Sequence, residues 1–518
     1  MASRFTFDDG LSLFAGGLCG LFAAWITWSW IYNLWFHPLA LAGFPGPKIA
    51  TGSLWWKRWH YNVTRDHIPA LFELHAKYGS VVRVAPNELH FSDPDAYGEL
   101  YSPNRRWLKQ ENLYGKLVEG ESTWNFLDYP SAKKRREVLL SHFSRKSVIE
   151  LQYLVQDRLD ILCDAIAQND LYGKPSDFTH AFRCFALDTI TSVCFAKPVE
   201  ATRAPGLKSP MMISMDKALP ILQLFVHFPI VRWIASKIPP DTMVAMHKSM
   251  KGYGQFRKML ADQIREILAD PSVLTNAPHP IIYHSLLNFN PAKSAASQTA
   301  TTNAEQLSFV DLNEEAFVLV FAGADTGSNA VLCGVVHSIE NRRIYKKLKE
   351  ELLSVWPVLE DKPRYEVLEK LPYLTAVVKE SLRMSHGIVS PPLRIVPPEG
   401  ATIAGHAIPG GTFVGMSSCF VHWSESIFPD ARKFNPERWL TPESKNLEQY
   451  LVAFSKGPRS CVGINLGYCE LYLAIANVFR RFDMELDGVS TADFRWVDYY
   501  LPFHVGPDMT VRAKPVSA

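Results

Sequence analysis

The first 36 residues differ from the rest of the chain in their pattern of apolar and polar positions. From Leu11 to Phe36 the chain carries no charge, which predicts a helix of about 39 Å, enough to cross a hydrocarbon core of about 30 Å. Its aromatic residues crowd the C-terminal half, where an interfacial belt belongs. A cleaved signal peptide is the alternative, because Ala40-Leu41-Ala42 imitates a cleavage site, but the apolar run exceeds a normal signal-peptide core.

The pattern after the apolar run predicts a large folded domain. We expect a short lumenal leader over residues 1–10, a transmembrane anchor over 11–36, a proline-rich hinge over 37–50 and one catalytic domain over 51–518. The hinge contains Pro45-Gly46-Pro47, in which two prolines fix the backbone around one glycine. Basic residues follow the anchor, so the positive-inside rule places the catalytic domain in the cytosol.

Apolar periodicity in the large domain predicts mainly helical structure with small β-sheets. A helix is expected over 67–78, a strand-like run over 81–91, and a new helix after Asp93-Pro94, an acidic cap followed by proline. The stretch 133–340 is mostly helical in pattern, with a loop at 288–306. Short β-like runs with Pro and Gly occupy 392–416 and 494–512.

One predicted helix, 308–340, contains residues that suit a plain core helix poorly. It begins with a capping signal at Ser308 and Asp311, and its middle reads Ala322-Gly323-Ala324-Asp325-Thr326. A glycine, a carboxylate and a hydroxyl there can open the helix locally and leave room for a small ligand and water. The alternative is an ordinary threonine bonded to the carbonyl four residues earlier.

Composition excludes several classes of function. The formal net charge of +2 implies no nucleic-acid partner, and a hydrophobic content of 47% is ample for a large core. The eight cysteines show no paired metal spacing and indicate a reducing compartment. No G-x-S-x-G, Walker or G-x-G-x-x-G signature is present, which removes the common hydrolase, nucleotide and dinucleotide interpretations.

The stretch 454–463, Phe-Ser-Lys-Gly-Pro-Arg-Ser-Cys-Val-Gly, is the most informative in the chain. Cys461 stands just ahead of an expected helix N-terminus, where backbone N–H groups and the helix dipole favour thiolate. Gly457 and Gly463 suit tight turns and a close approach of backbone to a flat ligand. A buried, inert thiol is the alternative.

The spacing Phe-x-x-Gly-x-Arg-x-Cys-x-Gly closely resembles the haem-ligand loop of the cytochrome P-450 haem-thiolate monooxygenases. The segment 322–326 resembles the oxygen-activation motif of that family, and Glu380-Ser381-Leu382-Arg383 and Pro436-Glu437-Arg438 follow in family order. The resemblance therefore extends over essentially the whole chain. It implies the haem-thiolate fold, with heme b held by the thiolate of Cys461 as axial iron ligand.

The resemblance also implies roles for further residues. Thr326 hydrogen-bonds iron-bound oxygen and Asp325 delivers protons, while Glu380, Arg383 and Arg438 form a buried structural network. The haem is expected to contact Arg459, Arg136, Arg394, Lys133, Phe454 and Gly463, with Trp124 at its edge. At the position where the family usually has a histidine, four residues before Arg136, this chain has Ala132.

The implied function is hydroxylation or epoxidation of an apolar secondary-metabolite scaffold by O₂, in a fungal pathway at the endoplasmic reticulum membrane. A terpenoid is favoured, and a polyketide or an alkaloid is the alternative. Electrons would come from an NADPH-cytochrome reductase docking near Lys133, Lys134 and Lys456. A haem-thiolate isomerase or dehydratase, and a membrane-bound haem carrier or sensor, are competing hypotheses. The expected substrate pocket comprises Leu113, Phe126, Phe225, Phe317, Phe321, Leu393 and Leu501.

Overall fold

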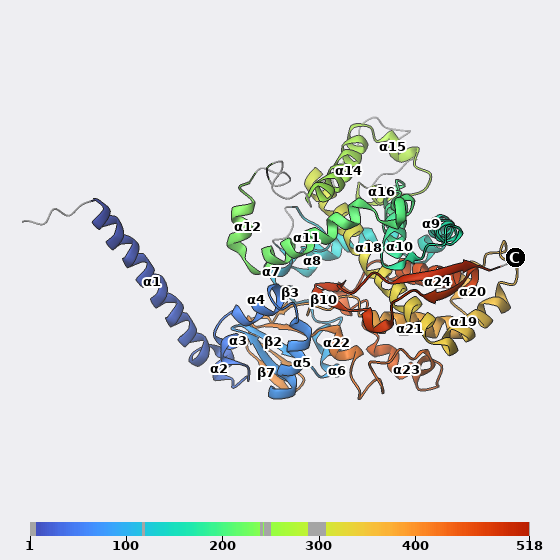
Figure 1. Ribbon diagram of the computed structural model, residues 1–518. Helices are drawn as coiled ribbons and strands as arrows, with labels where there is room; N and C mark the ends of the chain where they lie inside the picture. The colour runs from blue at the N-terminus through green and yellow to red at the C-terminus, as the bar shows by residue number, and fades with distance from the viewer. Residues whose placement is uncertain (1–6, 116–119, 239–241, 243–249, 288–306, 517–518) are drawn as a thin grey trace, which may run out of the picture.

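The computed structural model describes residues 7–115, 120–238, 242, 250–287 and 307–516 (Figure 1). Most of this part is helical. The helices of eight or more residues are α1 (Phe7–Trp35), α4 (Trp55–Asn62), α5 (His67–Tyr78), α8 (Tyr129–His142), α9 (Arg145–Leu171), α10 (Phe178–Phe195), α11 (Pro210–His227), α14 (Met250–Ala269), α18 (Phe309–Glu340), α19 (Arg342–Val355), α21 (Pro372–Ser385) and α24 (Ile464–Arg481). The shorter ones are α2 (Pro38–Leu41), α3 (Lys48–Gly52), α6 (Pro94–Leu100), α7 (Glu111–Tyr114), α12 (Pro229–Ala235), α15 (Ser272–Thr275), α16 (Ile282–Leu286), α20 (Tyr365–Leu368), α22 (Ser418–His422) and α23 (Ser444–Leu447).

The strands form small sheets. The largest has the order β1 (Val81–Ala85), β2 (Glu88–Phe91), β8 (Phe413–Gly415), β5 (Arg394–Ile395) and β3 (Leu108–Lys109). Its pairs are antiparallel except β2 with β8. The remaining sheets are β4 (Ser176–Asp177), β12 (Thr510–Pro515) and β9 (Phe482–Leu486); β6 (Ala401–Ile403) and β7 (His406–Ile408); and β10 (Trp496–Tyr499) and β11 (Leu501–His504).

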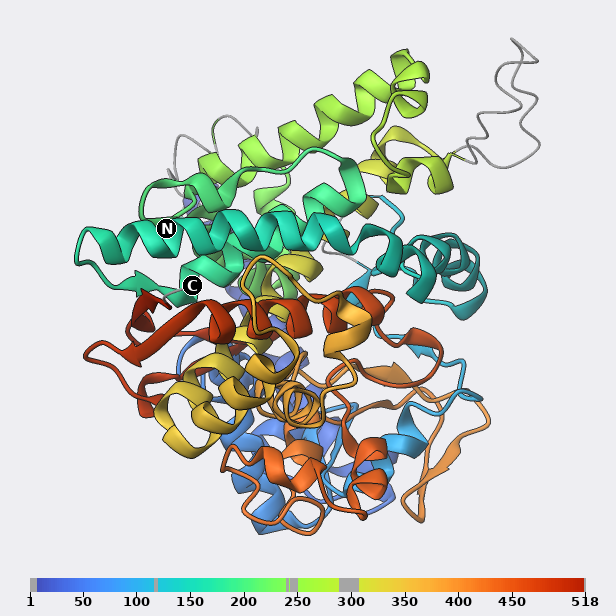
Figure 2. The same ribbon diagram turned by 90° about the vertical axis from the view of Figure 1, so that its right-hand side faces the viewer.

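Two large apolar clusters form most of the described core, and a small third cluster lies around Phe428 and Trp439. The larger joins α9, α10, α18, α21 and α24 through residues such as Leu159, Phe182, Val336 and Phe479. The smaller lies between the five-stranded sheet and the helices beside it, around Leu71, Phe91 and Val414. In Figure 2 the blue N-terminal elements and the orange segment of residues 400–450 lie at one end of the molecule, and the yellow-green α14 at the other. The long α18 runs between them, so it contacts both halves.

The predicted local structure is confirmed at most positions. The helix at 67–78 is α5, and Asp93 caps α6 by accepting from the backbone N–H of Asp95. The run 81–91 is two strands joined by a turn at Pro86-Asn87, because proline cannot donate to a sheet ladder. Short strands occupy both β-like regions. The loop predicted at 288–306 lies outside the described residues.

The helix α18 begins where the capping signal predicts. The Ser308 hydroxyl accepts from the Asp311 N–H at 3.1 Å, and the Asp311 carboxylate accepts from the Ser308 N–H. The helix is unbroken through residues 322–326. The expected local opening is therefore wrong for this structure.

The N-terminal helix α1 projects away from the body of the protein (Figure 1). Its contact with the body is close at one point, where Trp30 covers Gly52 and the Asn33 amide donates to the Gly52 carbonyl at 2.9 Å. By length and hydropathy, α18 is the one described helix that could cross a membrane, and 56% of its most apolar window is buried in the protein. The described part of α1 misses that criterion, so membrane anchoring remains a prediction.

Candidate functional site

The loop before α24 holds Cys461 in a fixed turn. The Cys461 N–H donates to the Phe454 carbonyl at 2.9 Å, which closes the loop. Gly457 has φ +70°, and a Cβ there would overlap the Tyr101 carbonyl oxygen, so no larger residue fits. Gly463 is the cap residue of α24. The predicted order of turn, cysteine and helix start is confirmed.

The Cys461 side chain is surrounded by the walls of a cavity inside the protein and is exposed to that space. Burial raises the pKa of the thiol, while a hydrogen bond from the Gly463 backbone and the charge of Arg136 lower it. The sequence predicted that the helix N-terminus would favour thiolate. In this structure burial outweighs that effect, so a bound metal cation would be needed to deprotonate the thiol fully.

The cavity above Cys461, called here the Cys461 cavity, has two kinds of wall. On one side α18 supplies Val318, Leu319, Ala322, Gly323 and Thr326. On the other, Phe454, Gly463 and Leu466 flank the cysteine. Gly323 packs against Ile190 so closely that a Cβ would lie 2.9 Å from its side chain, so this helix lies tightly against α10. The cavity thus combines a sulfur ligand with a mostly apolar α18 face, which also carries the Glu315 carboxylate.

Four cations line one edge of the Cys461 cavity: Lys109, Arg136, Arg394 and Arg459. Burial and the three neighbouring guanidinium groups hold the pKa of Lys109 well below its usual range. Burial also lowers the pKa of Arg459 to about 10, and its Nε and Nη1 atoms are buried without a hydrogen-bond partner among the described residues. Burying four cationic side chains together costs free energy of folding unless an anion lies among them.

These residues fit haem. A haem with its iron on the Cys461 sulfur brings two propionate groups, which would satisfy the orphaned nitrogens of Arg459 and neutralise Lys109. Of the residues predicted to contact haem, Arg136, Arg394, Arg459, Phe454 and Gly463 all line the Cys461 cavity, as does Trp124.

Lys133 does not line this cavity. Its side chain is 55% exposed and its Nζ lies 3.5 Å from Glu137. Ala132 beside it is fully buried. The cavity is lined by a different lysine, Lys109 of β3.

Thr326 and Asp325 face different cavities. The Thr326 hydroxyl lines the Cys461 cavity and donates to the Ala322 carbonyl at 2.8 Å, the ordinary i−4 bond. Asp325 lines a second cavity bounded by α10, α11 and α18, called here the polar cavity, where its Oδ1 accepts from Arg183 at 2.8 Å. Arg183 also binds Asp216 of α11 through both terminal nitrogens. The predicted pair is thus divided in this structure.

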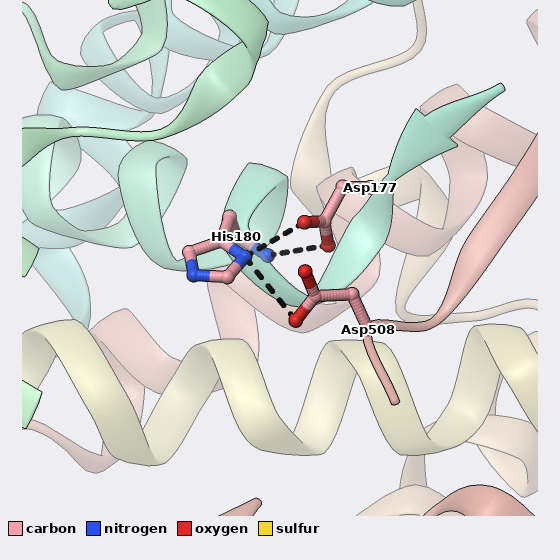
Figure 3. Close-up of side chains that lie close together, drawn as sticks. All are labelled: Asp177, His180 and Asp508. Atoms are coloured by element: carbon pink, nitrogen blue, oxygen red, sulfur yellow. Dashed lines mark hydrogen bonds and ion pairs between the residues drawn. The ribbon is translucent and has the colours of Figure 1, made fainter. Parts of the chain in front are cut away.

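A further ionic cluster lies at the rim of the polar cavity (Figure 3). The His180 Nδ1 lies 2.8 Å from Asp177 and 3.7 Å from Asp508. The Lys208 ammonium lies 3.3 Å from Asp177 and 3.0 Å from Asp508, so it supplies a cation to both carboxylates. Asp177 also caps α10. The cluster joins the start of α10 to the segment before β12 and needs no metal ion.

The predicted network of Glu380, Arg383 and Arg438 is present and buried. The Glu380 carboxylate accepts from Arg383 at 2.8 and 2.9 Å and from Arg438 at 3.2 Å. Arg383 is fully buried and also donates to the carbonyls of His422 and Ala431. Burial tends to raise the pKa of Glu380, but Arg383 and Arg438 overcome it and lower the pKa. Because every partner is satisfied, the network fixes the segment before Cys461 to α21.

The seven residues predicted for the substrate pocket lie elsewhere than the Cys461 cavity. Leu113 and Leu393 line a third cavity, here the outer cavity, between α4, α7 and α11, and Leu501 lines the polar cavity. Phe317 and Phe321 pack on one another in the core, at 5.9 Å between ring centroids. Neither Phe126 nor Phe225 lines any of the three cavities. Residues near several of the seven in the sequence do line the Cys461 cavity, among them Trp124, Val318, Pro392 and Tyr500.

Lys109, Tyr500 and Glu470 are among the residues of the Cys461 cavity that sequence reasoning missed. Lys109 belongs to a two-residue strand without a motif, and Tyr500 stands at a hairpin tip next to the predicted Leu501. Glu470 lines the cavity from α24, and burial raises its pKa to about 8. Glu470 could have been found from the sequence, because it is a carboxylate at an apolar position of the helix, nine residues after Cys461.

The comparisons with known proteins agree with this geometry. Residues 46–495 match the family model described as Cytochrome P-450. The chain is 32% identical to the cytochrome P-450 monooxygenase flvC of Aspergillus flavus, over 96% of this chain and 95% of that protein. It is 33% identical to macH of Penicillium terrestre, over 94% of both, and 31% identical to oblB of Cochliobolus heterostrophus, over 92% and 90%. With the cysteine loop, the cation edge and α18 in place, the chain belongs to the cytochrome P-450 family and is a monooxygenase, which implies a haem-thiolate cofactor, O₂ and a reductase as electron donor.

Proposed function

We propose that this monooxygenase hydroxylates or epoxidises an apolar scaffold of fungal secondary metabolism, with a terpenoid as the favoured class. The observation that carries the proposal is the Cys461 cavity, where a sulfur ligand and four cations face an apolar helix wall. Bound there as heme b, the cofactor supplies iron chemistry that activates O₂, and a cysteine thiolate favours O–O cleavage. A terpenoid is favoured over polyketides and alkaloids because the α18 wall is mostly apolar, and its one carboxylate, Glu315, is already paired with Arg135.

Different residues would bind the cofactor, hold a proton and exclude water. Cys461 would hold the iron, and Lys109, Arg136, Arg394 and Arg459 would hold the propionates. Thr326, which lines the same cavity from α18, would hold a proton at its hydroxyl. Val318, Leu319 and Ala322 exclude water there, and water exclusion keeps reactive oxygen from leaking as peroxide.

Proton supply would pass from Asp325 to Thr326. Asp325 is held by Arg183 in the polar cavity, so it must leave that guanidinium, or act through water beside α18, to reach the hydroxyl. Burial raises the pKa of Asp325 although Arg183 lowers it, and a raised pKa suits a group that carries a proton.

A membrane location is supported by exposed apolar residues on two elements, α4 and α12. Trp55 and Trp59 of α4 and Ile230 and Trp233 of α12 are each more than half exposed. Arg58 ties these elements together by stacking on Trp55 and on Phe228, at 5.8 and 4.9 Å. We propose a single-pass anchor, α1, in the endoplasmic reticulum membrane, with the catalytic domain in the cytosol and this surface on the bilayer.

Removing residues 1–44 tests the anchor. The truncated protein should leave the carbonate-resistant membrane fraction but retain some salt-insensitive peripheral binding through α4 and α12. Carbonate-resistant insertion of the truncated form would contradict a single anchor.

The electron donor proposed is the NADPH-cytochrome reductase. Reversing the charge of Lys133, Lys134 and Lys456 should raise the apparent Michaelis constant for reductase and weaken its salt dependence. A change in substrate affinity alone would argue against docking there.

The function is tested with holoenzyme, reductase and NADPH. Oxygen consumption that depends on a sesquiterpene or diterpene, with one oxygen atom in the product, supports it. Turnover without oxygen would favour the isomerase or dehydratase, and haem binding without turnover a carrier or sensor. Cys461→Ser should abolish both turnover and the red-shifted carbon-monoxide band, whereas Cys469→Ala, at a buried position outside the cavity, should retain both.

A further inference from the structure

The tip of the β10–β11 hairpin carries a strained tyrosine. Tyr499 pairs with Leu501, which leaves Tyr500 alone in the turn with φ +74°. Residues other than glycine rarely adopt this backbone conformation, which costs about 1–3 kcal/mol. Strain of this kind persists only where the surroundings fix the residue, and it is concentrated at functional positions.

The surroundings of Tyr500 do fix it. Its carbonyl accepts from the backbone N–H groups of Val389 and Ser390, at 3.1 and 3.4 Å. Its own N–H donates to Asp498 Oδ1 at 2.9 Å, and the Ser390 hydroxyl donates to the same oxygen at 2.6 Å. Asp498 is 3% exposed. The turn is therefore held from both sides, and Asp498 is the positioning residue.

The Tyr500 side chain stands between two cavities. Among the described residues, it is the one that lines both the Cys461 cavity and the outer cavity. Its hydroxyl lies 3.2 Å from that of Tyr114, and its ring meets Trp124 edge-on at 4.8 Å. The three aromatic rings come from two separate regions of the chain, so together they form a wall.

The outer cavity differs in chemistry from the Cys461 cavity. Lys57 and Glu88 pair in its wall at 2.7 Å, and Gln223 and Asn112 add amide groups. Apolar side chains such as Leu113 and Phe413 complete it. A molecule that extends from above Cys461 into this space would have an apolar reacting end and a hydrogen-bonding far end.

We propose that Tyr500 is a specificity-determining residue that separates the Cys461 cavity from the outer cavity and so limits the length of molecule that binds with one end over Cys461. Elongated substrates enter only when the Tyr114–Tyr500 pair parts. The inference rests on the proposed function, because it takes the Cys461 cavity as the place of reaction.

The test uses the haem-loaded full chain and two probes, 1-butylimidazole and 1-dodecylimidazole, whose imidazole binds iron while the tail measures length. Tyr500→Ala should tighten 1-dodecylimidazole about tenfold and leave 1-butylimidazole within twofold. Tyr500→Gly should do the same and unfold at a higher temperature than Tyr500→Ala, because glycine adopts φ +74° without strain. This second variant keeps the test valid if the alanine variant unfolds.

Matched variants distinguish the loss of the aromatic wall from a general loosening of the hairpin. Leu501→Ala, next along the chain but lining the polar cavity, should not change the ratio of the two affinities. Tyr500→Phe and Tyr114→Phe should each change it by about twofold to threefold, and the double variant no further, because both remove the same hydrogen bond. An unchanged ratio in both Tyr500→Ala and Tyr500→Gly would overturn the inference. If 1-butylimidazole gave no spectral shift with the unaltered protein, the haem assignment itself would fail.

Discussion

Arg183 lies 2.8 Å from Asp325, so the acidic residue next to Thr326 is tied to α10 rather than facing the Cys461 cavity. The same guanidinium holds Asp216 at 2.8 and 2.5 Å, which connects α18, α10 and α11 at one point. The two carboxylates raise the pKa of Arg183 against the effect of burial. Arg183 therefore holds both Asp325, the residue of the proposed proton route, and Asp216 of α11.

Replacing Arg183 by methionine should destabilise the protein by about 3 kcal/mol, because two partly buried carboxylates lose their counter-charge. The midpoint of urea unfolding measures this loss. The triple variant with Asp216→Asn and Asp325→Asn should recover most of it, since a network removed whole is close to neutral. A triple variant no more stable than Arg183→Met would show that packing, not charge, carries the contact.

Lys109→Met should accelerate transfer of haem to apomyoglobin about tenfold, because the buried ammonium is one of four cations at the propionate edge of the cavity. Lys133→Met is the matched control. Its side chain is 55% exposed and paired with Glu137, so haem transfer should not change. Equal effects of the two variants would contradict the assignment of Lys109.

The starts and lengths of helices could be predicted from the sequence, but the cavity that each side chain lines could not. The Ser308 cap, the length of α18 and the Asp93-Pro94 helix start follow from local rules. In contrast, Tyr500 stands at the tip of the hairpin and Leu501 begins the next strand, and the two neighbours line different cavities. The expected pocket residue Leu501 therefore missed the Cys461 cavity by one position in the sequence.

The same reason explains α18. Phe317 and Phe321 are four residues apart and share the face that packs in the core, while Val318 and Ala322 share the face over Cys461. Which face meets the cavity depends on contacts with α10, far away in the sequence. Lys109 was hidden for a related reason, since its burial results from strand pairing with Arg394 of β5.

Thr326→Ala should leave haem content and substrate binding unchanged and divert electrons to peroxide, because it removes the hydroxyl facing the Cys461 cavity. The measurement is product formed per NADPH consumed, which we expect to fall about tenfold, within the range that a single proton-transfer group contributes. Ser328→Ala is a close control. Its hydroxyl makes the same i−4 bond, to Ala324 at 2.7 Å, but lines the polar cavity. Loss of coupling in both variants would point to the helix and not to the Thr326 proton.

Glu470→Gln should stabilise the protein increasingly as pH rises from about 5 to 8. The Glu470 carboxyl is buried beside Gly327, where a Cβ would lie 2.9 Å from its oxygen, and burial raises its pKa to about 8. Below the ordinary pKa both folded and unfolded chains hold the proton. Above it the unfolded chain releases the proton while the folded chain keeps it, so the native protein loses about 1.4 kcal/mol of stability per pH unit until its own pKa is passed.

The glutamine variant lacks this loss, so the difference in unfolding midpoint between it and the unaltered protein should grow across pH 5, 6.5 and 8. The exposed Glu399→Gln should give a constant difference. A constant difference for Glu470→Gln as well would mean that the carboxyl is ionised throughout. A cation bound in the Cys461 cavity would then be needed to stabilise the ionised carboxylate of Glu470. The charges assigned to the residues of that cavity would have to be revised.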